Sequence, residues 1–315
     1  MRITILALAV LAQSAGPIFR FEADGFWLNL HHFLYVLGRA QNGAPDARRS
    51  AVEAAPADQT AGLKVLNEVD RKAWADAVTF YANGLSKQDA VFDRELIDVT
   101  RAMRVMPTAT SRILKVDAAL VATLDRAAPI YRRVWWPRHQ KANNDRAREF
   151  AGYLENYGPK VLAYVTKAYQ QTWPKGGFPV NFSGYTNWAG AYSTTGELIV
   201  IASLDPGTSG TLGLESMFHE AMHQWDDAMM TRLSRLSKAN QTSAPRQGIT
   251  HALIWYTAAE AVKSVVPSHR GYAEVGGMWN QKGLGSFKAG LDAHWKPYLE
   301  GNSTLDAALV GLLKS

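Results

Sequence analysis

The segment His219-Glu220-Ala221-Met222-His223 decides how the rest of this 315-residue chain is interpreted. Residues four apart lie one above the other on the same face of a helix, so two imidazoles at this spacing can bind one metal ion. The glutamate after the first histidine then lies close to the ion, where it can take a proton from a water molecule. The spacing therefore predicts a helix that carries a metal site.

The sequence around the motif is apolar at three- and four-residue spacings, which predicts a single helix from Thr211 to Lys238. Turn-forming residues at 205–210 precede it and offer N-cap side chains. A His-Glu-His set among apolar neighbours is costly to bury without a partner, and a metal ion is such a partner. The alternative is a solvated pair of histidines that binds no metal.

The composition narrows the kind of site. The chain has no cysteine, which excludes disulfides, thiolate ligands and a cysteine nucleophile. Zinc ligands would then be His, Asp or Glu, a set more typical of a catalytic site than of a structural one. The net charge of +6 is spread out, and its densest basic cluster, at 132–148, is interleaved with tryptophans and an aspartate. We therefore expect a solvated helix face there and no nucleic-acid partner.

The first fifteen residues have the pattern of a secretory signal peptide. Arg2 is followed by an apolar run from Ile3 to Ala12 and by small residues suited to cleavage. The run is too short to span a bilayer, so we expect a secreted or periplasmic protein with no membrane span in the mature chain. A buried N-terminal helix or strand is the alternative. The oligomeric state is left open.

Two regions are expected after residue 15. Residues 16–173 have helical periodicity over most of their length, and the adjacent His31 and His32 within them point about 100° apart, which suits packing or hydrogen bonding better than a shared ion. Residues 174–315 contain a strand-like segment at 178–182 and a predicted hairpin of 191–193 with 198–202. The fold class is therefore α+β, predominantly α, with a small antiparallel sheet.

A catalytic zinc usually has three protein ligands, so a third is needed beside the two histidines. Glu260 is the preferred choice, because it is a lone acid in the apolar segment 251–262 and an unpaired carboxylate there would be expensive. A salt bridge to an arginine is the alternative explanation for Glu260, and Glu274 is the alternative ligand. Asp226 and Asp227 share the motif helix and suit a hydrogen bond to a ligand histidine.

With Glu260 included, the segment from Phe178 to Val266 resembles the gluzincin group of zinc metallopeptidases. The resemblance implies a zincin-like catalytic region, one catalytic Zn²⁺ held by His219, His223 and Glu260, Glu220 as general base, and a peptide or protein substrate. Many gluzincins carry an aspartate four residues after the third ligand, where this chain has Ser264. Asp226 or Asp227 would replace that aspartate, or the third ligand would be another residue.

Hydrolysis would also need a donor for the oxyanion of the tetrahedral intermediate. Tyr272, Tyr256 and His251 are the candidates, and Tyr272 is favoured because a donor on a Gly-containing loop can fold over the site. Three other functions stay open: a zinc-binding protein without peptidase activity, a zinc hydrolase of cell-wall peptide or small amides, and a helical envelope protein in which the motif is incidental.

Overall fold

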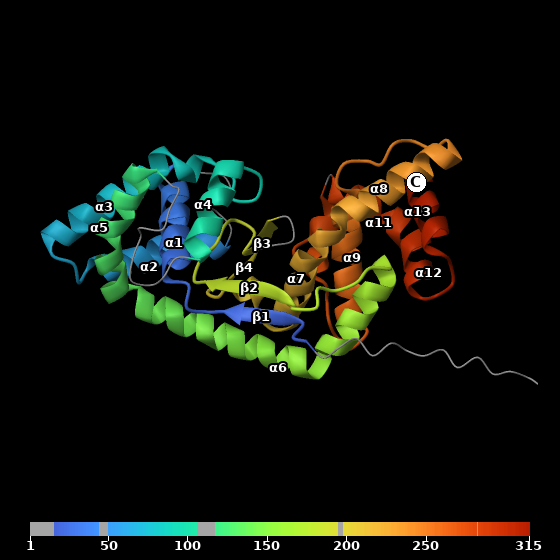
Figure 1. Ribbon diagram of the computed structural model, residues 1–315, viewed down its shortest axis with the longest axis horizontal. Coiled ribbons are helices and arrows are strands. Elements are labelled where there is room, and N and C mark those ends of the chain that lie inside the picture. The colour runs from blue at the N-terminus through green and yellow to red at the C-terminus, as the bar shows by residue number, and fades with distance from the viewer. Residues whose placement is uncertain (1–15, 44–49, 106–116, 195–197, 282) are drawn as a thin grey trace, which may run out of the picture.

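The computed structural model describes residues 16–43, 50–105, 117–194, 198–281 and 283–315 (Figure 1). The predicted signal peptide at 1–15 and the middle of the predicted hairpin turn, at 195–197, lie outside these ranges. Helices dominate, and a small sheet lies between the N-terminal and C-terminal helices (Figure 1). The α+β, predominantly α prediction is therefore confirmed.

The sheet has four strands in the order β1-β2-β4-β3. Its strands are β1 (Phe19–Glu22), β2 (Phe178–Ser183), β3 (Ala191–Thr194) and β4 (Leu198–Ala202). The predicted hairpin is confirmed, because β3 pairs with β4 in antiparallel register. The prediction of an antiparallel sheet is wrong for the other two pairings, since β1 with β2 and β2 with β4 are parallel. The sheet is mixed, and its antiparallel strand β3 is at one end.

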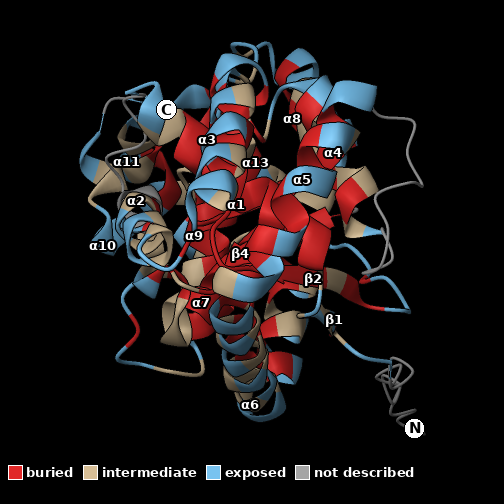
Figure 2. Cartoon of the chain, turned by 90° about the vertical axis from the view of Figure 1, so that its left-hand side faces the viewer, coloured by how far each residue is buried: buried red, intermediate tan, exposed pale blue. Residues whose placement is uncertain are grey.

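Both faces of the sheet are covered, which explains the continuous apolar run of β4. Leu198 and Val200 belong to the core formed with the N-terminal helices, whereas Ile199 and Ile201 belong to the core formed with the C-terminal helices. Alternate side chains of a strand point to opposite faces, so a strand between two helical layers is apolar at every position. Figure 2 shows the resulting buried centre, with exposed residues on the outer helices.

The N-terminal layer is built around α1 (Phe26–Gln41), which is almost entirely buried. The other helices of this layer are α2 (Ser50–Leu63), α3 (Glu68–Asn83), the 3-10 helix η2 (Leu85–Lys87), α4 (Arg94–Arg104) and α5 (Ala118–Val134). The long helix α6 (Trp136–Tyr169) follows and runs along the sheet to the C-terminal side (Figure 1). Strand β1 and helix α6 thus place parts of region 16–173 in the same sheet and core as region 174–315.

The C-terminal layer contains the motif. Its main helices are α7 (Gly210–Met222), α8 (Asp226–Asn240), α9 (Ile249–Lys263) and α13 (Leu305–Lys314). The shorter elements are η3 (Pro206–Thr208), η4 (His223–Trp225), α10 (Tyr272–Val275), η5 (Met278–Asn280), η6 (Leu284–Phe287), α11 (Lys288–Gly290), η7 (Leu291–Trp295) and α12 (Lys296–Leu299). Helix α7 approaches α6 closely at Gly213, where a Cβ atom would lie 2.5 Å from the Phe150 ring.

The single helix predicted from Thr211 to Lys238 is wrong in one respect. Helix α7 ends at Met222, and His223 begins the 3-10 turn η4 before α8 starts at Asp226. The tighter turn lets the Asp226 side chain reach back to His223, three residues earlier. Within the described ranges, none of the helices combines the length and apolar character needed to cross a membrane.

Candidate metal centre

Three histidines from neighbouring elements converge on one point. His219 lies in the last turn of α7, His223 starts η4, and His251 lies in the first turn of α9. Their ring centroids form a triangle with sides of 5.0, 5.1 and 5.4 Å. Each ring offers a nitrogen, and the three nitrogens lie within 4.8 Å of one another. This arrangement could hold a metal ion.

The distances and the protonation of these rings suit a metal. The Nε2 atoms of His219 and His251 are 3.2 Å apart, and two nitrogens bound to one tetrahedral zinc are separated by about 3.4 Å. Burial lowers the pKa of His219 well below its usual value and that of His251 to about 4, and the charge of His223 acts in the same direction. Neutral imidazoles are the form that binds metal ions, so His219 and His251 suit a metal in this respect.

The predicted third ligand, Glu260, is not part of this group, and His251 takes its place. The two residues are nine positions apart on α9, which puts them about 180° apart around the helix. Glu260 is half-buried near Tyr164 of α6, where its charge adds to the effect of burial in raising the pKa of that tyrosine. Glu274 is also outside the group: it is exposed and pairs with Arg270 at 2.9 Å.

Asp226 orients one histidine of the group. Its Oδ2 lies 2.7 Å from Nδ1 of His223, which leaves Nε2 of that ring for a metal. Burial lowers the pKa of His223, but the hydrogen bond to Asp226 and the charges of Glu220 and Asp226 outweigh burial and raise it. Asp227 lies on the exposed part of the cleft lining. Of the two predicted supporting aspartates, Asp226 therefore makes the contact.

His219 is held mainly by packing. Its Nδ1 is buried and has no hydrogen-bond partner among the described residues. The indole of Trp255 lies against the ring, with centroids 3.7 Å apart, and the ring of Tyr272 stacks on Trp255 at 5.1 Å. A row of three rings thus connects the histidine group with α10.

Tyr272 is fixed by a buried acid. Its backbone N–H donates to Oε2 of Glu215 at 2.9 Å, and the same oxygen lies 2.7 Å from Nε2 of His269. Glu215 is fully buried on α7, one turn before His219. The prediction placed Tyr272 on a loop, whereas the structure places it as the first residue of α10. Through Glu215 its backbone is anchored to the motif helix.

The other predicted oxyanion donors are used differently. The hydroxyl of Tyr256 donates to Oδ1 of Asp292 at 2.8 Å, and Tyr256 does not line the cleft over the histidines. His251 belongs to the group of three histidines that could hold a metal ion. Tyr272 is the one of the three that lines the cleft and is outside that group.

Glu220 faces the cleft beside the histidines. Its side chain is largely buried, and burial raises its pKa, while the charge of His223 and hydrogen bonds from Ser193 oppose that shift. A raised pKa makes a carboxylate a stronger base, which suits a group that accepts a proton. Ser193 belongs to β3, so the end strand of the sheet contacts the acid of the motif.

The cleft has a volume of about 560 Å³ and brings together distant parts of the chain. Its lining comes from the motif, β3, α9 and α10, with Val91 and Phe92 added by the N-terminal layer. The N-terminal layer also supports β3, because the hydroxyl of Tyr192 lies 2.7 Å from Nε2 of His32. The sequence predicted neither contribution, although Phe92 could have drawn attention as an aromatic residue in a polar stretch.

Comparisons with protein-family models, with curated proteins and with solved structures found no match for this chain. The geometry of the site is therefore the basis for assigning a function.

Proposed function

We propose that this protein is a zinc-dependent hydrolase that cleaves peptide bonds. The observation that carries the proposal is the position of Glu220 beside three converging imidazoles in one cleft. His219, His223 and His251 would hold the ion, a set of three imidazole nitrogens of the kind that catalytic zinc sites use. When bound, Zn²⁺ would lower the pKa of a bound water and polarise the substrate carbonyl.

The remaining chemistry belongs to the chain. Glu220 accepts the proton of the attacking water and returns it to the leaving amine, a role that its raised pKa supports. Asp226 keeps the His223 ring oriented. The hydroxyl of Tyr272 is the donor proposed for the oxyanion, because Tyr272 lines the cleft and its backbone is anchored by Glu215.

A peptide substrate is favoured by the strand beside the site. β3 is at the end of the sheet and contributes residues 191–193 to the cleft lining. A strand in this position can pair its outer edge with an extended peptide. The zincin-like character of this region and export through the predicted signal peptide are parts of the same proposal. The ligand set departs from the gluzincin resemblance, because His251 replaces the glutamate.

The Glu220→Gln variant tests the proposal. Loss of the general base should lower the rate of peptide cleavage by about 10²–10⁴-fold while zinc stays bound. Cleavage of a quenched fluorescent peptide library and the zinc content of the purified protein are the two measurements. The matched control is Glu260→Gln, a half-buried glutamate on the far face of α9, which should leave both values unchanged.

Two results would reject the proposal. One is wild-type activity in Glu220→Gln, which would remove Glu220 as the base. The other is a native protein that binds zinc fully and cleaves no peptide in the library, which would favour a zinc-binding protein without peptidase activity.

A further inference from the structure

The cleft has one wall that the motif region does not supply. Val91 and Phe92 line it, and both belong to the loop between η2 and α4 in the N-terminal layer. The apolar part of the lining is completed by large side chains from the C-terminal half, including Trp188, Trp255 and Met278. Apolar groups thus enter the cleft from two regions that are far apart in the sequence.

Phe92 is unusually exposed for an aromatic residue. It is 79% exposed. Among the large apolar residues of the described ranges, this is the highest exposed fraction. An aromatic ring left in water forgoes the stabilisation that burial would give it. At the wall of a cleft, the ring can recover that stabilisation when a ligand covers it.

The loop that carries Phe92 is held firmly from within. Oδ1 of Asp89 accepts the backbone N–H of Val91 at 2.8 Å and that of Phe92 at 3.3 Å, which closes an Asx turn. Ala90, between them, is buried in the N-terminal core. The backbone of Phe92 therefore has a fixed position while its side chain stays exposed.

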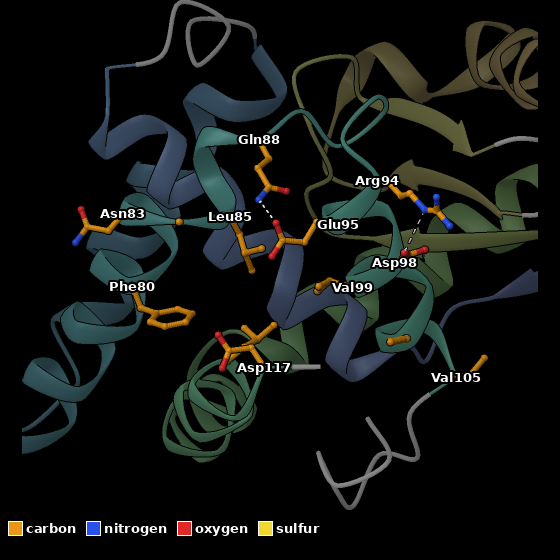
Figure 3. Close-up of a pocket in the computed structure, with 13 residues that line it drawn as sticks. Phe80, Asn83, Leu85, Gln88, Arg94, Glu95, Asp98, Val99, Val105 and Asp117 are labelled. Carbon is orange, nitrogen blue, oxygen red and sulfur yellow. Dashed lines mark hydrogen bonds and ion pairs between the residues drawn. The ribbon is translucent and has the colours of Figure 1, made fainter. Parts of the chain in front are cut away.

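The start of the loop is tied down as well. The carbonyl oxygen of Gln88 accepts bonds from the Tyr35 hydroxyl at 2.9 Å and from the Arg39 guanidinium at 3.2 Å. The Gln88 amide donates to Glu95 of α4 at 2.7 Å. Figure 3 shows this hydrogen bond in a second cavity, whose lining includes both residues. Because the loop is already ordered, a ligand that contacts Phe92 would bind with little loss of loop entropy.

We propose that Phe92, together with Val91, binds a bulky apolar side chain of the peptide substrate close to the bond that is cleaved. The N-terminal layer would then set the substrate preference of a site whose chemistry lies in the C-terminal layer. This inference rests on the proposed function for the identity of the ligand as a peptide. An aromatic or long aliphatic side chain fits the lining, whereas a charged side chain would lose hydration against Phe92 and Trp188.

Binding without turnover tests this inference. The zinc-loaded Glu220→Gln variant would be titrated with fluorescein-labelled peptides that differ only in carrying Phe, Ala or Lys at one position, and anisotropy would give each Kd. We expect the Phe peptide to bind about tenfold more tightly than the Ala peptide, the effect of one buried aromatic contact. Adding Phe92→Ala should remove most of that difference and leave the Ala peptide within about twofold.

Two further variants serve as controls. Val69→Ala removes an apolar side chain of similar exposure, 78%, from α3, and should change no Kd. Phe92→Leu keeps an apolar side chain on the loop and should retain part of the preference for Phe.

The inference would be overturned by an equal loss of affinity for all three peptides in Phe92→Ala, by the absence of any preference, or by tightest binding of the Lys peptide, which would point to Asp227 instead.

The proposed function fails by a different result. If the native chain binds the Phe peptide through Phe92 and cleaves no peptide, the binding site stands and the hydrolase is rejected. If cleavage occurs and Phe92→Ala leaves its selectivity unchanged, only the present inference is rejected.

Discussion

Histidines lie close together in both layers of the protein, and the two sets have different surroundings: His31 and His32 are buried in the N-terminal layer, whereas His219 is buried and His223 and His251 are partly buried in the C-terminal layer. In the N-terminal layer, Nδ1 of His31 lies 2.9 Å from the Tyr81 hydroxyl and Nε2 lies 3.3 Å from the Thr100 hydroxyl. His32 is paired with the hydroxyl of Tyr192. Both nitrogens of His31 thus have a hydroxyl neighbour, as buried polar groups normally do, whereas His32 has a hydroxyl neighbour at Nε2 and no hydrogen-bond partner at Nδ1 among the described residues.

In the C-terminal layer, the three rings of His219, His223 and His251 have each other as neighbours. Nε2 of His219 faces Nε2 of His251, and His223 completes the triangle. Three nitrogens turned toward one point are poor partners for one another but good ligands for a cation. The comparison shows that burial alone does not distinguish the candidate metal site; what distinguishes it is the convergence of three ring nitrogens within 4.8 Å of one another.

The largest effect that this contrast predicts is on zinc binding. His251→Ala should weaken zinc by more than the 10–100-fold that loss of a supporting partner costs, because it removes a ligand itself. Glu260→Ala, on the other face of the same helix, and His31→Gln, in the N-terminal layer, should both retain full zinc. Competition titration with a chromogenic chelator measures all three. Weak binding in Glu260→Ala together with normal binding in His251→Ala would restore the glutamate as ligand.

A smaller effect is expected from the residue that orients His223. Asp226→Asn should weaken zinc by about 10–100-fold, because the bond that holds Nδ1 loses its charge. Asp227→Asn is the matched control, since that carboxylate is exposed and adjacent in sequence. The same chelator titration applies. Equal losses in the two variants would mean that general charge, and not the contact with His223, supports the metal.

The smallest predicted effect is the pH dependence of folding stability that His31 of the N-terminal layer causes. Burial lowers the pKa of His31 from 6.5 to about 3. Between these values the unfolded chain binds more protons than the folded one, so stability falls as the pH falls, by at most about 1.4 kcal/mol per pH unit for one group. Urea unfolding of metal-free protein at neutral and mildly acidic pH should show this loss, and His31→Gln should show less of it. If the native chain and His31→Gln lose the same stability on acidification, His31 does not contribute to the acid sensitivity.

The sequence predicted the elements whose signals are local. The helical character of region 16–173, which includes α1, and the hairpin of β3 and β4 follow from patterns contained within a few turns or strands. The parallel pairing of β1 with β2 was missed, because Phe19 and its partner Phe178 lie far apart in the chain and a four-residue strand has little pattern of its own.

The site was predicted where one helix sets the geometry and missed where two elements must meet. His219 and His223 are related by a spacing that any helix imposes. For α9, periodicity showed that His251 and Glu260 point in opposite directions but not which of them faces the motif. The contribution of Phe92 depends on how the N-terminal layer packs over the sheet, and no spacing within one element encodes that.

The strand β1 has a consequence for how the molecule is made. It is the first described element of the chain, and among the described strands it pairs only with β2, which follows all of the N-terminal helices. During synthesis, β1 and the N-terminal helices therefore lack their partner β2 until residues near 180 have been made. We therefore expect that a chain cut between α6 and β2 yields neither half in native form when each is expressed alone, and that co-expression of the two pieces rescues both.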